Sequence, residues 1–210
     1  MFKPFFATLA ALLALGLSTE ADAQWDARYD SATRAVVIES GFINADEWIE
    51  VSLDIPSGKG ISWVVVEHFP SLETRRFRLF PLGSPGKVQL ISFFGDDDID
   101  TFINNTDIKS YAIGFGGDDF LQGGSKSDVF QGFDGNDTLI GNGGRDELFG
   151  GVGFDYLNGG DGRDTLDPGD DNFEDALIGG LGSDTFLIAF GQQFAFYDLN
   201  LSQGDEEFVD

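Results

Sequence analysis

The sequence predicts an all-β protein in which a solenoid of short parallel strands follows a smaller strand-rich segment. Three observations support this fold class. Apolar and polar residues alternate at period two from Ile49 to Ile55, as in a half-buried strand. A nine-residue repeat rich in Gly and Asp occupies residues 95–187. No helical periodicity appears after residue 23.

Residues 1–23 have the features of a secretory signal peptide. Lys3 precedes an apolar run from Phe5 to Leu17, and Ala21-Asp22-Ala23 forms the small-x-small pattern of a cleavage site. This run is shorter than the roughly 20 residues that a membrane helix needs. We therefore expect a secreted protein without a membrane span that begins at Gln24, with the periplasm and the cell surface as further possible locations.

Composition divides the remaining chain near residue 95. From Gly95 onward lie 26 of the 37 acidic residues, 4 of the 12 basic residues and 23 of the 29 glycines. The net charge of -25 argues against a nucleic acid partner, because phosphate binding requires clustered Lys and Arg. The absence of Cys excludes disulfide frameworks and Cys-ligated zinc.

Residues 24–94 are predicted to form a small β domain or a cap on the solenoid. Strands are expected at 36–38, 49–55, 61–66, 76–80 and 87–94, separated by turns such as 56–60. The single histidine, His68, has neither a second histidine nor a nucleophile elbow to act with. We therefore predict that the protein is not an enzyme, and the alternative is a secreted hydrolase with its catalytic site in residues 24–94.

Ten units of nine residues make up residues 95–187. The clearest are four contiguous units from Gly132: GFDGNDTLI, GNGGRDELF, GGVGFDYLN and GGDGRDTLD. The sixth positions of the ten units, aspartate in nine of them, are Asp100, Lys109, Asp118, Asp128, Asp137, Asp146, Asp155, Asp164, Asp175 and Asp184. The eighth positions, large and mainly apolar, are Phe102, Tyr111, Phe120, Phe130, Leu139, Leu148, Leu157, Leu166, Leu177 and Phe186.

Each part of the repeat has a physical role. Glycine permits the positive φ angles and close chain approach of a tight turn. The turn carbonyls and the following aspartate then supply oxygen, the ligand type that Ca²⁺ prefers. The last three residues form a short strand whose central side chain faces inward. Two units make one coil of 18 residues, and each coil needs its neighbours to bury its apolar face.

GGVGFDYLN, GGDGRDTLD and GGLGSDTFL resemble the hemolysin-type (RTX) calcium-binding nonapeptide repeat. The resemblance implies a parallel β-roll with Ca²⁺ as cofactor, held between loops of successive coils by sixth-position aspartates and by carbonyls of the Gly-rich turns. The implied aspartate ligands are Asp100, Asp118, Asp128, Asp137, Asp146, Asp155, Asp164, Asp175 and Asp184. The implied glycine ligands are Gly114, Gly116, Gly135, Gly144, Gly151, Gly153, Gly160, Gly162, Gly180 and Gly182.

Alternate units place their loops on opposite sides of the roll. Asp100, Asp118, Asp137, Asp155 and Asp175 are expected on one side, and Lys109, Asp128, Asp146, Asp164 and Asp184 on the other. Adjacent aspartate pairs then predict about seven ions. Lys109 is expected to abolish the site it would share with Asp128. Without calcium, repulsion among stacked carboxylates should keep the roll largely unfolded.

Residues 188–210 lose the repeat and are predicted to cap the end of the roll. The segment from Asp198 to Asp205 also resembles the sequence that follows such repeats, so it either binds one more ion or forms a solvated turn. An ice-binding or adhesive solenoid is disfavoured because the seventh position varies from Thr138 to Glu147 and Tyr156. The sequence thus predicts an exported calcium-binding protein with a structural or surface-interaction role, and indicates no particular protein or polysaccharide partner.

Overall fold

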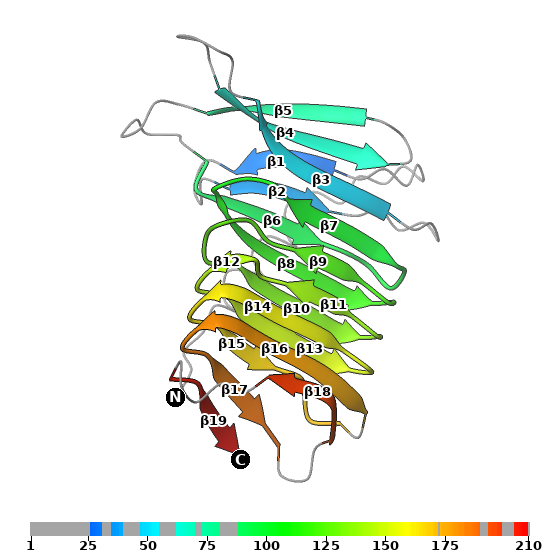
Figure 1. Cartoon of the computed structure of the whole chain (residues 1–210). Coiled ribbons are helices and arrows are strands. Elements are labelled where there is room, and N and C mark those ends of the chain that lie inside the picture. Colours follow the sequence, from blue (N-terminus) through cyan, green and yellow to red (C-terminus); the bar gives the residue numbers. More distant parts are fainter. Residues whose placement is uncertain are drawn as a thin grey trace.

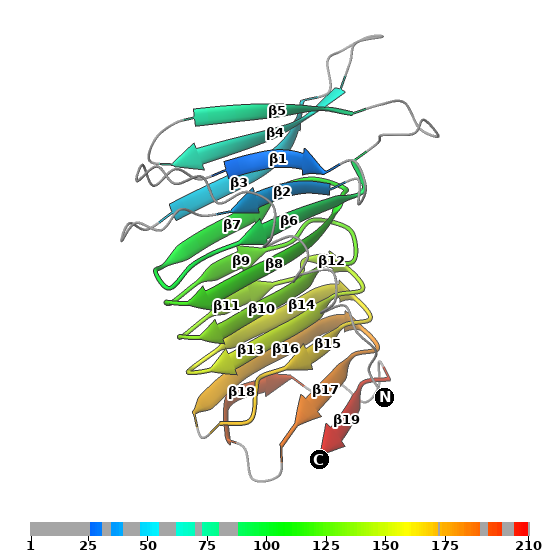
Figure 2. The ribbon, with the colours of Figure 1, turned by 180° about the vertical axis from the view of Figure 1, so that it is seen from behind.

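The computed structural model describes residues 26–30, 35–39, 47–54, 62–69, 73–79, 88–171, 173–189, 193–198 and 204–209. These residues form two facing sheets and contain no helix (Figures 1 and 2). The all-β parallel roll predicted from the sequence is confirmed. The signal peptide predicted for residues 1–23 lies outside the described residues.

Each sheet runs the length of the roll. The first has the strand order β1 (Asp26–Asp30), β2 (Ala35–Glu39), β6 (Leu90–Phe94), β8 (Lys109–Gly116), β10 (Val129–Asp134), β13 (Glu147–Val152), β15 (Thr165–Asp167), β17 (Thr185–Ile188) and β19 (Glu206–Val209). The second has the order β18 (Gln193–Asp198), β16 (Glu174–Gly182), β14 (Tyr156–Gly162), β11 (Thr138–Ile140), β9 (Phe120–Gln122), β7 (Asp100–Asn104), β3 (Glu47–Asp54), β4 (Ser62–Phe69) and β5 (Glu73–Leu79). The short β12 (Gly143–Gly144) pairs with β14.

The chain passes from one sheet to the other and back in each coil. Strands of successive coils pair in parallel, and in the central coils the partners are 18 residues apart: Phe130 pairs with Leu148, and Leu139 pairs with Leu157. This spacing is twice the nine-residue repeat. The sequence period therefore sets the register, because every coil presents the same residue types at the same height.

In the central coils the core is a column of one inward apolar side chain per strand. Leu139, Leu148, Leu157, Leu166 and Leu177 are completely buried. Towards the N-terminal end the column becomes aromatic, where Phe93 stacks on Phe102 with ring centroids 5.2 Å apart. The apolar residues at position eight therefore hold the two sheets together.

The structure corrects the predicted register in two units. Tyr111 and Phe120 were expected in the core, but the structure buries Ala112 and Leu121 there and leaves the two aromatic side chains half-buried. Successive side chains of a strand point to opposite faces, so a shift of one residue exchanges the inner and outer sets. The actual unit begins at Gly114 rather than at Ile113.

The strands before residue 95 continue both sheets. β1 and β2 form an antiparallel pair that joins the first sheet through β2 and β6, which are parallel. β3, β4 and β5 form an antiparallel meander that joins the second sheet through β3 and β7. The five predicted strands correspond to β2, β3, β4, β5 and β6, with ends that differ by a few residues, whereas β1 was not predicted. His68 lies in β4, and its side chain is outside the described set.

None of the described residues forms a helix of the length and apolar character that a membrane crossing requires.

Candidate calcium-binding ladders

Buried aspartates line the two edges of the roll where the chain crosses between the sheets. We call the edge where it passes from the first sheet to the second the first edge, and the opposite one the second edge. The first ladder, on the first edge, contains Asp100, Asp119, Asp137, Asp155 and Asp175. The second ladder, on the second edge, contains Asp128, Asp146, Asp164, Asp184 and Asp205.

A repeated hydrogen bond connects each ladder along the roll. The backbone N–H of each aspartate donates to Oδ1 of the aspartate in the next coil, as from Asp137 to Asp155 at 2.8 Å and from Asp146 to Asp164 at 2.9 Å. Four such bonds occur on the first edge. Four also occur on the second edge. One carboxylate oxygen of each acceptor aspartate is thereby fixed in place.

Two ladder positions differ from the sequence prediction. Asp119, rather than Asp118, occupies the first ladder, and Asp118 is exposed and accepts hydrogen bonds from Asn136. Ser110, rather than Lys109, aligns with the second ladder and donates to Asp128 from both its N–H and its hydroxyl. Both differences follow from the one-residue register shift described above.

Asp205 extends the second ladder beyond the recognisable repeats. It is buried, and its Oδ1 accepts from the N–H of Asp184 at 3.1 Å. The neighbouring strand β19 continues the first sheet in parallel with β17. The resemblance of residues 198–205 to a post-repeat segment was the only sequence signal for this position.

The second carboxylate oxygen of many ladder residues is buried without a hydrogen bond. Among the described residues this holds for Oδ2 of Asp119, Asp137, Asp146, Asp155 and Asp164. A buried polar atom without a partner is costly unless a ligand compensates it. These atoms therefore mark places where a cation would be stabilised.

Each of these oxygens lies against the glycine that starts its repeat unit, at a position where a side chain could not fit. A Cβ atom on Gly132 would overlap Oδ2 of Asp137 and would also meet the carbonyl oxygen of Gly150 in the next coil. Gly141 has the same relation to Asp146 and to the carbonyl of Gly159. Carboxylate and carbonyl oxygens thus lie close together beside each of these glycines, and such oxygens are the ligand type that Ca²⁺ prefers.

The glycines implied as ligands lie on the turns of both edges. Gly114, Gly116, Gly135, Gly151 and Gly153 lie on the first edge, and Gly144, Gly160, Gly162, Gly180 and Gly182 lie on the second. Gly135 and Gly153 show why glycine is required: both have positive φ, and a Cβ on Gly153 would overlap the carbonyl oxygen of Gly135. Sequence reasoning missed the first-position glycines such as Gly132, whose carbonyls border the carboxylates.

Burial also changes the acidity of the ladder. It raises the pKa of Asp119 to about 8, against the opposing hydrogen bond from the backbone of Asp100. Burial likewise raises the pKa of Asp146 and of Asp155 to about 7, with a further contribution from neighbouring aspartates. For Asp128, Asp137 and Asp164 the pKa is raised to about 6 by burial. A bound cation would favour the ionised form instead.

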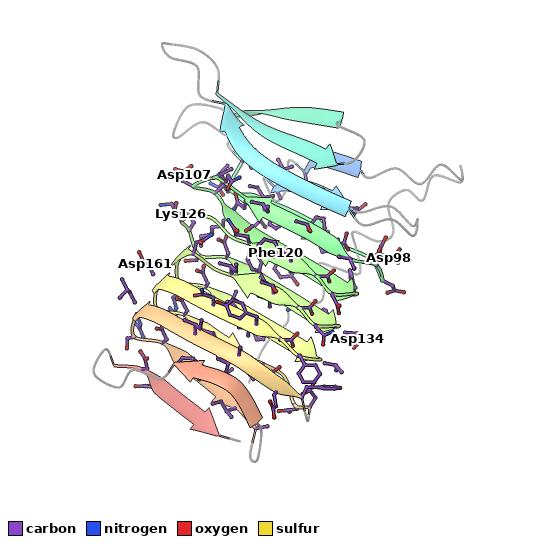
Figure 3. The ribbon with its side chains drawn as sticks, turned by 45° about the vertical axis from the view of Figure 1, so that its right-hand side comes forward. Asp98, Asp107, Phe120, Lys126, Asp134 and Asp161 are labelled. Atoms are coloured by element: carbon purple, nitrogen blue, oxygen red, sulfur yellow. The ribbon has the colours of Figure 1, made fainter. Side chains whose placement is uncertain are left out.

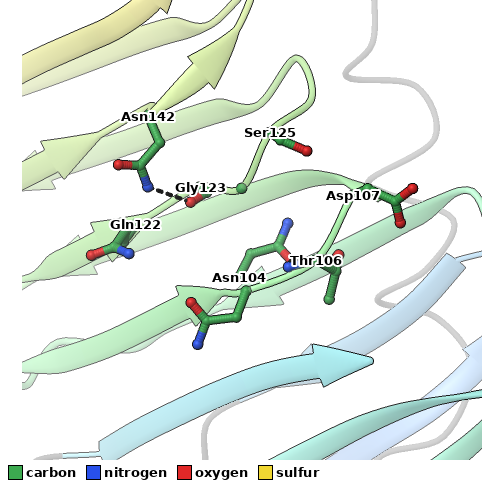
Figure 4. A pocket seen from close by; sticks show the side chains of 9 residues that line it. Asn104, Thr106, Asp107, Gln122, Gly123, Ser125 and Asn142 are labelled. Carbon is green, nitrogen blue, oxygen red and sulfur yellow. Dashed lines mark hydrogen bonds between the residues drawn. The ribbon is translucent and has the colours of Figure 1, made fainter. Parts of the chain in front are cut away.

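The second ladder ends at Ser110, beside a polar pocket (Figure 4). The pocket has a volume of about 450 Å³ and is lined by Asn104, Asn105, Thr106, Asp107, Gln122, Gly123, Gly124, Ser125 and Asn142. Here Asn104 and Thr106 bond to each other, and Asn142 donates to the carbonyl of Gly123 at 2.7 Å. Amide and hydroxyl groups thus replace the carboxylate pair at this end of the ladder.

Among the described residues, no group of three or more carboxylate or imidazole side chains gathers as a metal cluster. The ladder aspartates lie one per coil on each edge, so that an ion between two coils would meet the carboxylates of only two of them. Backbone carbonyls would have to complete the coordination. The glycine turns supply them at every coil, so the residues present fit calcium.

The fold and these ladders define a β-roll with a row of buried aspartates along each edge. Residues 113–148 and 140–172 match the profile of the RTX calcium-binding nonapeptide repeat (4 copies). Residues 113–172 therefore match a repeat of the kind that binds Ca²⁺. The resemblance and the calcium cofactor inferred from the sequence are thereby confirmed. Neither a curated protein nor a solved structure gives a significant match.

Proposed function

We propose that this chain is an exported calcium-binding β-roll in which the ions lie between adjacent coils at the two ladders. The observation that carries the proposal is the row of buried Oδ2 atoms that lie close to backbone carbonyls of the next coil, beside glycines that leave no room for a side chain. Four adjacent aspartate pairs on each edge give about eight sites, one more than the sequence predicted, because Asp205 adds a pair.

In this proposal calcium supplies the positive charge that the ladders lack, and the chain supplies rigid oxygen donors. The backbone hydrogen bond to Oδ1 orients each carboxylate, so that Oδ2 faces the carbonyl of the next coil. The strands before residue 95 and those after 187 continue the sheets, which supports a capping role for both segments. The protein's role would be structural or at a surface rather than catalytic, and RTX repeat proteins are typically exported.

The adjacent residues Asp118 and Asp119 allow a direct test of which aspartates bind calcium. Asp119→Asn keeps an oxygen that accepts the N–H of Asp100 but removes the charge shared by two ladder pairs. Calorimetric titration should show about two fewer calcium ions per chain, because a neutral amide is a weaker calcium ligand. Asp118→Asn, which alters the exposed neighbour, should leave the number unchanged. Equal losses in both variants, or a loss with Asp118→Asn alone, would contradict the assignment of the ladder.

A further inference from the structure

Exposed apolar side chains collect on the first edge of the roll. Among the described residues, the large apolar side chains exposed there are Ile99, Phe115, Phe133, Val152, Phe154 and Phe173. Leu181 is the one exposed on the second edge. We call Phe115, Phe133, Val152, Phe154 and Phe173 the aromatic stripe. It covers four successive coils, or about 15 Å at the usual strand spacing.

The rings of the stripe form two pairs. Phe115 and Phe133 stack with centroids 5.8 Å apart, and Phe154 meets Phe173 edge to face at 4.8 Å. Val152 lies between the pairs, opposite Asp134 in the strand register. Phe133 is 46% exposed and Phe154 is 54% exposed, so the pairs bury only part of their surface in each other. The outer part of the stripe remains available to a ligand.

The backbone at the first pair is strained. Phe115 and Phe133 both have φ of 80°, in the left-handed region that favours glycine. In the next coil the residue aligned with Phe133 is Gly151, which adopts a positive φ without steric strain because it lacks a Cβ atom. A bulky, exposed aromatic residue in this conformation weakens the fold, and such strain typically occurs at functional sites. Stability of the roll alone therefore does not account for these two phenylalanines.

Charge distinguishes the two edges. The loops of the first edge contain no Lys or Arg, and their exposed carboxylates include Asp97, Asp118, Asp134 and Asp170. The basic residues after Gly95, Lys109, Lys126, Arg145 and Arg163, all lie on the second edge. Figure 3 shows Asp98 and Asp134 at one edge and Lys126 at the other. The stripe is thus an apolar surface bordered only by negative charge.

We propose that the aromatic stripe docks a cationic, partly apolar peptide segment of another protein. Guanidinium groups bind the faces of aromatic rings, and aliphatic side chains would cover the rest of the stripe. The bordering carboxylates would attract such a segment and exclude acidic ones. A second copy of this chain is a poor occupant, because the eight proposed Ca²⁺ ions would reduce the net charge of -25 without reversing it, so that two copies would still repel each other.

Glycine substitutions can distinguish a docking role of the phenylalanine rings from a structural role. The double variant Phe115→Gly with Phe133→Gly removes the first ring pair and also the backbone strain. The probe is a fluorescent ten-residue peptide of alternating Arg and Leu, titrated in millimolar calcium and followed by anisotropy. We expect roughly tenfold weaker binding, as for loss of interface anchors. Thermal stability should be unchanged or higher, whereas a purely structural role for the rings would lower it.

Matched controls define the remaining outcomes. The variant Leu181→Ser, which alters an apolar residue on the opposite edge that is more exposed than Phe115 or Phe133, should bind the peptide like the wild type. Peptides of alternating Arg and Ser, or of Glu and Leu, should bind weakly. Unaltered affinity in the double variant would overturn the proposal. Self-association of the wild type that the double variant abolishes would also overturn it, since a second copy would then cover the stripe. Calcium binding is measured in a separate experiment, so a negative result for peptide docking would not contradict the proposed calcium-binding function.

Discussion

In excess EGTA at neutral pH, the chain is expected to lose most of its β-sheet circular dichroism signal and to regain it when calcium is restored. The first reason is electrostatic. Ten aspartates lie in the two ladders, and each is at most 5% exposed. Burying ionised carboxylates beside one another is strongly unfavourable unless cations compensate them.

The second reason is the small amount of core per residue. Several strands have only three residues, such as β9 and β11, and each of these buries a single side chain, Leu121 or Leu139. Ordering the backbone costs roughly 1–2 kcal/mol per residue, so this burial does not offset the cost by itself. Calcium binding would supply the missing free energy.

Magnesium provides the control for this experiment. It demands near-ideal octahedral geometry and retains its waters, so it should restore much less signal than calcium at the same concentration. A spectrum in EGTA that is identical to the calcium spectrum would show that the roll folds without metal.

Acidification should partly replace calcium. In EGTA, the β-sheet signal is expected to increase as the pH is lowered from about 8 to about 5. The pKa of Asp119 is raised from 3.8 to about 8 in the folded roll, and burial raises the pKa of Asp146 and Asp155 to about 7. The folded state therefore binds more protons than the unfolded state across this range.

The direction of the effect follows from this difference in proton binding. A raised carboxylate pKa stabilises the folded state fully below 3.8, and this contribution is lost as the pH rises through about 6 to 8. Urea titrations in EGTA at a series of pH values measure it. Calcium affinity should change in the opposite direction, because protons compete with the ion. An apo roll that becomes more stable with rising pH would contradict buried carboxylates as the cause.

The roll could be predicted from the sequence because each nine-residue unit contains the residue types that the turn, the ligand position and the strand require. Glycine at the turns, aspartate before the strand and leucine within it recur together, and the coils that contain Leu139, Leu148, Leu157 and Leu166 match the prediction residue by residue. The alternation of loops between two edges followed from the period alone.

The remaining differences arise where the repeat is ambiguous. Asp118 and Asp119 are adjacent, as are Phe120 and Leu121, so either residue of each pair satisfies the pattern locally. Only pairing with the neighbouring coil, where Leu121 aligns with Leu139, selects the inner residue. Asp205 was less predictable because the segment before it contains a single glycine, Gly204, instead of the several glycines of a repeat turn. The aromatic stripe has no signal in the repeat, since it occupies positions that the pattern leaves variable or assigns to glycine.

The most direct test of the account is calcium titration of the full chain by calorimetry at neutral pH. The eight adjacent aspartate pairs predict about eight ions per chain, and the Ser110–Asp128 position predicts none. Their dissociation constants should fall at or below the millimolar range of extracellular calcium modules. Absence of binding at millimolar calcium would contradict the assignment of the buried ladders as calcium sites.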